Sequence, residues 1–554
     1  MEQKIAQLVF DEFGQQVEVA LTRPDAEFGD YATNVALQLA GKVGKAPREI
    51  AEQLASKIRD TDGFADVTVA GPGFINIHLE PQQLLELVKS EPTPQYPGQV
   101  IVLEYSCPNA FKELHTGHLY QTVFGDILSR LLLVSGAKLQ RTSFGGDVGL
   151  HVAKCLYGMV QNFGGEYPEK LETIDTDPFE RARWISERYV EGASAYEDNP
   201  DAKATIDELN KTIYGFHDSD DHESPLAKIY WETRQWSFDY FDAFYKLIDV
   251  DSMPYYPESA TAPTGLKVVK EQLALGKLKE SEGAIVFEGD EDKHLHTRVF
   301  ITSKGLPTYE TKDIGVIWQE REDYHFDHRY LITGNDQREY MRVVFAAAET
   351  FDPSLSGTMT HLTNGTVRFA DGKKMSSRLG NVARAIDVVD IVREKVAEIV
   401  EDKSIIEDVT LGAIKYVFAK YKLGGDIAFD IEETVSLQGN SGPYLQYAHA
   451  RARRILEKAG GVVVSLDEVR DEDRLLVRKL GEYSETIELA AKNLEPHHIC
   501  NYLFELAQEF NRYYEKNQVI GNEHEQHRLG LVATYADTLR AGLMILGIAA
   551  PDKM

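Results

Sequence analysis

One stretch of the chain, from Val100 to Gly136, restricts the possible fold more than any other. It begins with VIVLEYS, a β-branched and aromatic run with the length of a strand. Beyond a polar turn, apolar residues recur at helical spacing: Leu119, Val123, Phe124, Ile127, Leu128, Leu131 and Leu132. Gly136 is suited to end that helix. A strand that leads through one turn into a helix is typical of an α/β sheet, so we expect such a sheet here.

The turn between this strand and helix contains two histidines, His115 and His118, separated by a threonine and Gly117. The free N–H groups and the dipole of a helix start favour an anion there. A glycine lets a ligand approach the backbone closely, where a Cβ atom would obstruct it. Two histidines near a turn are more often packing or capping residues, so this motif alone leaves the function open.

A second motif, DGKKMSSRLGN, runs from Asp371 to Asn381 and follows another strand-like run. A glycine-flanked lysine pair with two serines can surround phosphates with ammonium groups and backbone N–H donors. Two such clusters on one α/β sheet predict an ATP site in which charge develops on departing pyrophosphate.

The chain divides by pattern into three parts. Residues 1–92 mix a helix pair with the strand-like GPGFINIHLE, and the proline-rich EPTPQYPG forms a linker. Strands and helices alternate over 99–385, with a charged helical insert at about 157–257, and residues 386–554 have helical periodicity. We therefore expect a multidomain α/β protein. It has a Rossmann-like parallel-sheet core with a helical insert, a small N-terminal α/β domain and an all-α C-terminal domain.

The three cysteines, Cys107, Cys155 and Cys500, lie far apart and form no C-x-x-C motif. Neither a disulfide framework nor a cysteine zinc site is expected from them, and we predict no structural zinc. No apolar run is long enough to span a bilayer, and the N-terminus lacks the layout of a signal peptide. These features predict a soluble cytoplasmic protein with no membrane partner.

The charge balance is acidic, with 59 basic and 89 acidic side chains and a formal net charge of −30. This total argues against a polyanionic partner, but binding depends on the local field and not on the sum. The locally basic run HARARRILEK, from His449 to Lys458, is one candidate contact. The alternative, a solvated helix face, is the default interpretation of such a run.

The paired H-x-G-H and K-M-S motifs resemble the two signatures of class I aminoacyl-tRNA synthetases. Four stretches, YSCPNAFKELHTGHL, PTYETKDIG, NSGPYLQYAHARARRIL and LGIAAPDKM, resemble the arginyl-tRNA synthetase family over nearly the whole chain. EFGDYATNVALQLA and VAGPGFINIHL look like that family's added N-terminal domain, which contacts the elbow of the tRNA. This family needs no structural zinc, in agreement with the cysteine spacing.

The resemblance implies a reaction in which L-arginine and ATP give arginyl-adenylate and pyrophosphate, after which the arginyl group passes to the 3′ end of tRNA(Arg). ATP enters with Mg²⁺, and the resemblance implies a monomer. Because the arginine carboxylate attacks the α-phosphate, the protein mainly aligns reactants and stabilises charge. The implied catalytic residues are Lys112, His115, His118 and Lys374, and the implied ATP-binding residues are His115, Gly117, His118, Lys374, Met375, Ser376 and Ser377.

A guanidinium group is best matched by a planar carboxylate partner. The family pattern assigns Glu104 and Asp313 to this role; the alternatives are a buried ion pair for Glu104 and a helix N-terminal acid for Asp313. The resemblance also brings further residues to the arginine: Ser106, Cys107, Asn109, His118, Tyr309 and Gln337. Instead of binding arginine, Tyr309 could be an ordinary core tyrosine, and Gln337 could be a residue at the start of a surface helix.

The helical C-terminal domain would bind the anticodon, since single-stranded bases are recognised by stacking and edge contacts. The positions that match the family are Tyr447, Ala450 and Met554, while Arg451, Arg453 and Arg454 can face phosphates. The alternative for Tyr444 and Tyr447 is a buried helix seam.

The chain departs from the family pattern at several positions. The second signature has Ser377 where the family has lysine, so Arg378 or Lys373 would have to supply that charge. Cys107 stands where serine is usual, and Ser143 and Val148 stand where asparagine and tryptophan are expected.

Two other classes of protein share parts of this pattern. A nucleotidyltransferase of small metabolites has H-x-G-H but does not need the helical domain or the N-terminal unit. A non-catalytic tRNA-binding relative of the synthetases would keep both appendages and lose phosphate ligands, yet His115, His118 and Lys374 are present.

Overall fold

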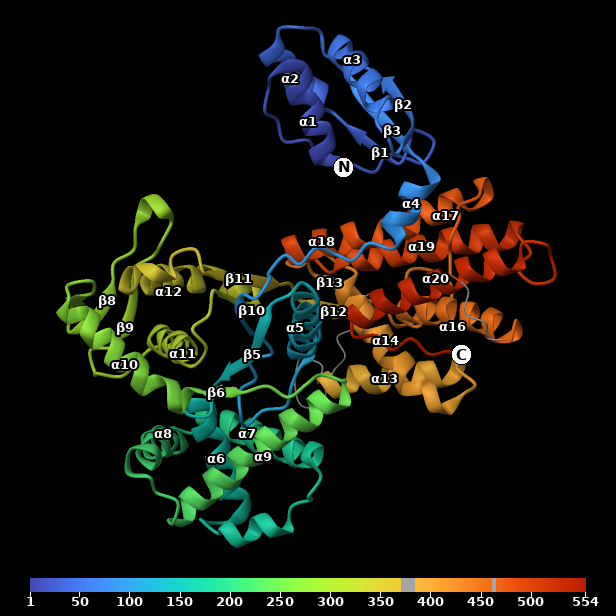
Figure 1. The fold of residues 1–554 in the computed structure, drawn as a ribbon. Coiled ribbons are helices and arrows are strands. Elements are labelled where there is room, and N and C mark those ends of the chain that lie inside the picture. Colours follow the sequence, from blue (N-terminus) through green and yellow to red (C-terminus); the bar gives the residue numbers. More distant parts are fainter. Residues whose placement is uncertain (370–383, 461–464) are drawn as a thin grey trace.

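The computed structural model describes residues 1–369, 384–460 and 465–554 (Figure 1). A small N-terminal unit stands apart at the top of Figure 1, above a central sheet that is flanked by helical parts. The residues predicted for the second signature, Lys374, Met375, Ser376 and Ser377, lie outside the described residues, as do Lys373 and Arg378.

The N-terminal unit is an antiparallel sheet of order β1-β3-β2 packed against helices. Its elements are α1 (Glu2–Phe13), β1 (Tyr31–Thr33), α2 (Val35–Val43), α3 (Pro47–Arg59), β2 (Phe64–Ala70) and β3 (Phe74–Leu79). α4 (Pro81–Val88) follows, and the unit contacts the C-terminal helices through buried Asp30, whose carboxylate accepts from Arg474. The predicted small α/β domain is confirmed.

The central sheet is parallel, with the strand order β11-β10-β4-β5-β6. Its strands are β4 (Val100–Glu104), β5 (Lys138–Gly145), β6 (Tyr255–Pro257), β10 (His328–Gly334) and β11 (Met359–Asn364). The chain starts in the middle at β4, builds one side, and returns to the other side of β4 with β10. The strand order therefore reverses between β4 and β10, which is where ligands bind in open α/β sheets.

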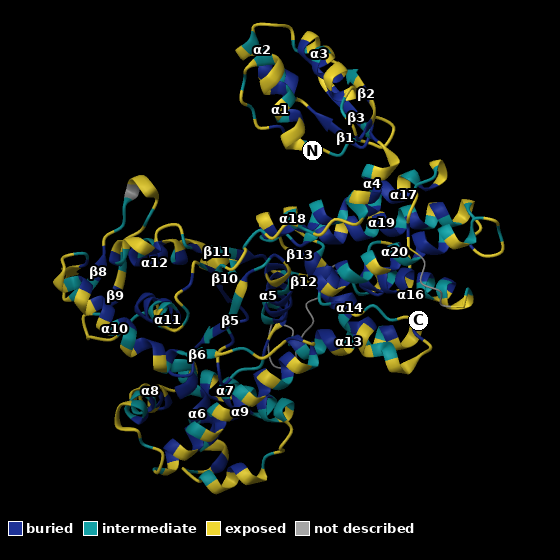
Figure 2. Ribbon diagram, viewed as in Figure 1, coloured by how far each residue is buried: buried dark blue, intermediate teal, exposed yellow. Residues whose placement is uncertain are grey.

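The predicted strand and helix on either side of the histidine turn are β4 and α5 (Thr116–Val134). Figure 2 shows α5 buried in the centre of the molecule, and its apolar residues Leu119, Ile127 and Leu131 are fully buried. The Rossmann-like core that this stretch predicts is confirmed.

The helical insert lies between β5 and β6, at the bottom of Figure 1. It consists of α6 (Leu150–Phe163), α7 (Pro178–Asp198), α8 (Pro200–Ser219) and α9 (Pro225–Leu247). These helices have their own apolar cluster, which includes Met159, Tyr230 and Trp236.

A further layer flanks the sheet on the side of β10 and β11. It contains α10 (Glu258–Ala274), α11 (Tyr309–Tyr324), α12 (Arg338–Phe351) and a separate antiparallel sheet of β7 (Lys279–Ser281), β8 (Ala284–Phe287) and β9 (Arg298–Ile301). The helices α10 and α11 meet at Gly265 and Gly315. A Cβ atom on Gly265 would lie 1.9 Å from the Thr311 oxygen, and one on Gly315 would lie 2.1 Å from the Thr261 oxygen. This backbone contact fixes the position of α11.

The C-terminal part is helical, as predicted. Its helices are α13 (Ala385–Ile399), α14 (Ile406–Ala419), α15 (Ile431–Thr434), α16 (Gly442–Lys458), α17 (Arg474–Leu480), α18 (Tyr483–Asn493), α19 (His497–Lys516) and α20 (Glu525–Ile545). A short parallel pair, β12 (Val367–Phe369) and β13 (Ile427–Phe429), joins it to the core. None of the helices described is long and apolar enough to cross a membrane.

Candidate active site

A cleft with a volume of about 1510 Å³ lies at the carboxyl ends of β4 and β10. It brings together most of the residues that the sequence assigns to ATP and arginine: Glu104, Cys107, Asn109, Lys112, His115, Gly117, His118, Tyr309, Asp313 and Gln337. Among the predicted residues that the structure describes, Ser106 is the exception, because its fully buried hydroxyl bonds to Tyr245 and Thr122 and does not line the cleft.

The turn after β4 has an unusual backbone. Ser106, Cys107 and Phe111 have φ values of 69°, 48° and 66°, in the left-handed region that side chains rarely adopt. Asn109 anchors this turn to β5, because its Oδ1 accepts the Gly146 N–H at 2.8 Å. Such strain is often found at functional sites, where the surroundings hold it in place.

His115 and His118 cap the start of α5 and each other. Nδ1 of His115 accepts from the N–H groups of Gly117 at 3.0 Å and His118 at 3.4 Å, and Nδ1 of His118 accepts from the His115 N–H at 3.2 Å. The rings stack with centroids 3.8 Å apart. The two histidines are therefore capping residues through their Nδ1 atoms, which was the alternative to a ligand-binding role. Since Nδ1 accepts, the neutral rings carry their proton on Nε2, which is left to donate to a ligand.

Burial first, and then the positive charge of Lys112, lowers the pKa of His115. Burial, His115 and Lys112 lower the pKa of His118 well below its usual value. Both imidazoles are therefore neutral near pH 7 and act as hydrogen-bond donors, not as cations. Lys112 supplies a cation to this wall, and its Nζ lies 4.4 Å from the ring centroid of Tyr189.

Gly117 has a local reason to be glycine. A Cβ atom there would lie 2.8 Å from Cε1 and 3.0 Å from Nδ1 of the His115 ring. The packing of the His115 ring therefore requires a glycine at this position, whether or not a nucleotide approaches it closely.

Glu104 forms a buried ion pair, which was the alternative to its predicted role as a partner of the arginine guanidinium. Arg329, 1% exposed, donates from Nη2 to Glu104 and from Nε to Glu320 at 2.6 Å. Burial raises the pKa of Glu104 to about 8; Glu320 and Asp313 add to this, while Arg329 opposes it. Glu104 nevertheless lines the cleft, 3.6 Å from the Cys107 sulfur.

Asp313 lies on the second turn of α11 and faces the cleft, so it is not the exposed helix-start acid of its alternative. The phenol of Tyr340 on α12 donates to its Oδ2. Burial raises the pKa of Asp313 to about 7, against the lowering effects of the Tyr340 hydrogen bond and Arg329. Three carboxyl groups, those of Glu104, Glu320 and Asp313, thus interact with the guanidinium of Arg329. Once Glu104 and Asp313 lose their protons, their negative charges exceed the charge of Arg329 and favour a cationic ligand.

The two remaining predicted residues lie at the edge of the cleft. Tyr309 is 68% exposed, which rules out its alternative as a core tyrosine. Gln337 ends a 3-10 turn, Asn335–Gln337, directly after β10, and its amide donates to Asp336 at 3.0 Å. Gln337 is thus both an exposed helix-start residue and part of the cleft wall.

Sequence reasoning missed many residues of the cleft, among them His151, Glu258, Arg298 and Tyr340. Glu258 and Lys312 form a buried ion pair across α10 and α11. The position of Glu258 directly after a strand was a usable signal, whereas nothing in the local pattern distinguished Tyr340 from a core tyrosine.

The described flanks of the second signature lie at the same cleft. Val367 and Arg368, before it, line the cleft. Arg384, after it, forms an isolated antiparallel β-bridge with the backbone of His115, and the Ala385 N–H donates to the Leu114 carbonyl at 2.8 Å. Both ends of the segment therefore meet the wall that contains the first signature.

The predicted tRNA-contacting residues are only partly exposed. Tyr447 is 43% exposed and Arg454 is exposed, whereas Ala450 is 5% exposed. Arg451 lies 4.7 Å over the Tyr514 ring and donates to Asn511 at 3.1 Å. The side chain of Ala450 therefore belongs to the core face of α16, and the exposed face presents the tyrosine and arginines. Met554 is half-buried against the core.

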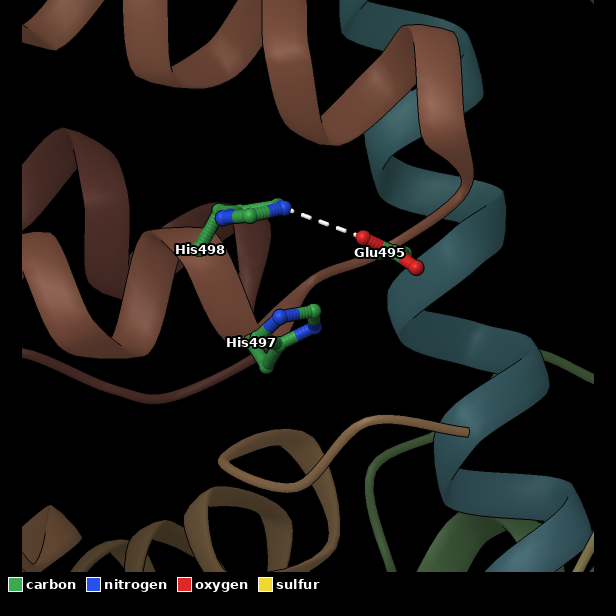
Figure 3. Close-up of side chains that lie close together, drawn as sticks. All are labelled: Glu495, His497 and His498. Carbon is green, nitrogen blue, oxygen red and sulfur yellow. Dashed lines mark hydrogen bonds and ion pairs between the residues drawn. The ribbon is translucent and has the colours of Figure 1, made fainter. Parts of the chain in front are cut away.

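One group of the described residues has the composition of a metal site: Glu495, just before α19, and His497 and His498, at the start of α19 (Figure 3). Nε2 of His498 lies 3.0 Å from the Glu495 carboxylate, and the Lys422 ammonium pairs with the same carboxylate at 2.8 Å. A lysine partner and the positive end of α19 both disfavour a second cation. We therefore assign no metal to this group, and the expected lack of structural zinc stays a prediction.

Three family models match consecutive parts of the chain. They are the arginyl tRNA synthetase N terminal domain at residues 1–79, the catalytic domain of class I (R) tRNA synthetases at 82–422, and the DALR anticodon binding domain at 445–554.

Relatives match over the whole length. The arginine–tRNA ligase of Limosilactobacillus reuteri is 30% identical, with 98% of this chain and 96% of that protein covered. That of Pasteurella multocida is 30% identical, with 97% and 98% covered. The fold is also that of Thermus thermophilus arginyl-tRNA synthetase, with a TM-score of 0.81, 24% identity, and 100% and 99% of the two chains covered. The arginyl-tRNA synthetase of Plasmodium falciparum gives a TM-score of 0.79 at 19% identity, with 100% and 97% covered. By its family models and its full-length relatives, the chain belongs to the arginyl-tRNA synthetase (arginine–tRNA ligase) family of class I.

Proposed function

We propose that this chain is an arginine–tRNA ligase that activates L-arginine with ATP to arginyl-adenylate and transfers the arginyl group to the 3′ end of tRNA(Arg) in translation. The observation that carries this proposal is a single cleft with two different walls. One wall is the helix start of α5, suited to phosphate, and the other contains the buried carboxylates of Glu104 and Asp313.

ATP lies along the first wall in this proposal. The Nε2–H groups of His115 and His118 donate to its phosphate oxygens, Gly117 is part of the same helix start, and Lys112 supplies a cation. Mg²⁺ enters with ATP, because hard phosphate oxygens suit that ion. The family resemblance adds Lys374, Met375, Ser376 and Ser377 at the departing pyrophosphate.

Arginine lies against the second wall. Asp313 and Glu104 face its guanidinium group, with Tyr309, Gln337, Asn109, Cys107 and the backbone at Ser106 around the rest of the molecule. The arginine carboxylate attacks the α-phosphorus, the bond to pyrophosphate breaks, and the donors of the first wall stabilise the charge that moves onto pyrophosphate. A ribose hydroxyl of the tRNA then displaces AMP, so no covalent bond to the protein forms.

The appendages bind tRNA(Arg). We propose domain boundaries of 1–92 for the N-terminal tRNA-contacting domain, 99–385 for the catalytic domain and 386–554 for the anticodon-binding domain. Tyr447, Arg451, Arg454 and Met554 are proposed anticodon-side contacts, supported by the exposure of Tyr447 and Arg454. The protein acts as a cytoplasmic monomer in this proposal.

ATP–pyrophosphate exchange with each standard amino acid, with and without tRNA, tests the function. Arginine alone of the amino acids should support exchange above background. Equal exchange with another amino acid would overturn the substrate assignment. Comparing the series with tRNA and the series without tRNA shows whether the activation of arginine requires tRNA.

The pH profile of kcat/KM for arginine should rise between pH 6 and pH 8.5. A guanidinium needs charged partners, and the pKa values of Asp313 at about 7 and Glu104 at about 8 leave both mostly protonated at pH 6. Each group that must lose its proton contributes up to about tenfold per pH unit below its pKa. His115 and His118 add nothing here, because their pKa values are lowered out of this window. A flat profile from pH 6 to 8.5 would contradict ionised carboxylates in the pocket.

Metal analysis should detect less than 0.1 equivalent of zinc, an order-of-magnitude limit for adventitious metal, in protein purified without added metal. The free cysteines Cys155 and Cys500 are buried, and Glu495 is already paired with Lys422. Stoichiometric zinc that survives dialysis against a weak chelator would contradict this prediction, and its loss in His498→Gln would locate it.

A further inference from the structure

Tyr340 contacts the carboxylate that defines the arginine pocket. It lies in the first turn of α12, and its phenol donates to Oδ2 of Asp313 on α11. Both residues line the cleft. Burial raises the pKa of Tyr340 well above its usual value, so the phenol keeps its proton and remains a donor.

The surroundings of Asp313 leave this bond without a substitute. Charged groups face it from four other places: Arg329 on β10, Glu104 on β4, Glu310 on its own helix and Glu258 on α10. Among the residues that the structure describes, Tyr340 is the one that donates a hydrogen bond to the Asp313 carboxylate. The nearby guanidinium of Arg298 lies 5.8 Å from the Tyr340 ring centroid and pairs with Glu310 at 3.7 Å.

A carboxylate on a short side chain can rotate about its Cβ–Cγ bond, and a fork-shaped ligand binds well only to one orientation of its plane. A donor that holds one oxygen fixes that plane. It also offsets part of the cost of keeping the carboxylate ionised in a buried, negatively charged pocket.

We propose that Tyr340 is a positioning residue for arginine recognition, which holds Oδ2 of Asp313 so that the carboxylate plane is aligned with the guanidinium before arginine binds. This inference rests on the proposed function, since it assigns Tyr340 a role in the arginine pocket and none in ATP binding.

Tyr340→Phe removes only the phenol oxygen and tests this inference. KM for arginine should rise roughly 10- to 100-fold, the range expected for one lost hydrogen bond to a charged group, while KM for ATP changes less than about twofold. The acid limb of the kcat/KM profile for arginine should also move to higher pH, because Asp313 loses the donor that favours its charged form.

The chain offers a matched control on the same helix. The Tyr256 phenol donates to Asp323 of α11 at 2.6 Å, and neither residue lines the cleft. Tyr256→Phe therefore removes the same kind of bond outside the pocket and should leave both KM values and the pH profile unchanged. In an Asp313→Asn background, Tyr340→Phe should raise KM for arginine by less than about twofold more, because the effect of Tyr340 depends on the Asp313 carboxylate.

The results separate the inference from the proposed function. Unchanged arginine KM and an unmoved acid limb in Tyr340→Phe would overturn the positioning role while wild-type arginine exchange remains. Equal losses for arginine and ATP at every pH would show a structural role and overturn it as well. Lack of arginine-dependent exchange in the wild type would instead overturn the proposed function.

Discussion

Asp313→Asn should lower kcat/KM for arginine by roughly 10²- to 10⁴-fold in ATP–pyrophosphate exchange. The substitution keeps the shape of the side chain, removes its charge, and replaces one acceptor oxygen by a donor that faces other donors. Breaking a desolvated ion pair on one side typically costs ~3–5 kcal/mol, because the remaining charge stays buried without compensation. The expected loss is therefore among the largest that one atom exchange can cause in this cleft.

Substrate analogues sharpen this result. Citrulline has nearly the shape of arginine but no charge, so the wild type should reject it strongly and Asp313→Asn should narrow the gap between the two. Lysine should stay a poor substrate for both, because its compact ammonium group cannot bind a forked site. The measurements are kcat/KM for arginine and the inhibition constant of citrulline.

Asp323→Asn provides the control, since Asp323 lies on the same helix and also accepts from a tyrosine, but outside the cleft. It should behave as the wild type. A kcat/KM for arginine within a few-fold of wild type in Asp313→Asn would remove Asp313 from the pocket and leave Glu104 as the candidate partner.

His118→Ala should lower the rate of adenylate formation by ~10²–10³-fold, the usual loss for one donor to a developing charge. The residue lies at the start of α5, where its Nδ1 caps the helix and its Nε2–H is left to donate to the ATP phosphates of the proposed complex. Loss of the cap costs about 1 kcal/mol of stability, so the variant should remain folded. ATP–pyrophosphate exchange and a thermal melt measure the two effects separately.

Two further variants serve as controls for His118→Ala. His118→Asn keeps a side-chain acceptor for the His115 N–H, so it should restore the melting temperature without restoring exchange. His524→Ala changes a histidine at the N-cap of α20 and should leave exchange intact. Normal exchange in His118→Ala would refute the assignment of ATP to this helix start.

Local patterns predicted the elements of the core well, and the reason is visible at α5. Leu119, Ile127 and Leu131 are fully buried at helical spacing in this central helix, so their spacing carries the information. The same holds for the strand VIVLE, whose burial on both faces requires the apolar run that the sequence shows. The fold class followed from such periodicities, together with the family resemblance.

The partners inside the cleft were much less predictable. Glu104 was predicted to be an arginine-pocket acid or part of a buried ion pair; the structure shows the ion pair and a position on the cleft wall, and the partner Arg329 comes from β10. That pairing depends on strand order, which no local pattern encodes. Tyr340 reached Asp313 for the same reason: α11 and α12 are separate helices whose contact depends on β10 between them in sequence.

Helix faces explain the remaining differences. Ala450 and Tyr447 are three residues apart on α16, yet Ala450 is 5% exposed and Tyr447 is 43% exposed, because only Ala450 belongs to the set of residues that this helix buries. Ser106 shares its turn with cleft residues, but its left-handed backbone directs the hydroxyl to Tyr245. Sequence position alone cannot distinguish the two sides of a helix or a turn.

The reversal of strand order at β4 also has a consequence for the newly made chain on the ribosome. Glu104 and Arg329 are 225 residues apart. At about 5–20 residues per second, the edge of β4 that later pairs with β10 waits roughly 10–45 s for its neighbour. During that time, an open apolar strand edge is a site for wrong pairing with other chains, and an inward-pointing charge on such an edge discourages it. An unpaired Glu104 would thus keep the unfinished sheet from aggregating until Arg329 arrives to neutralise it.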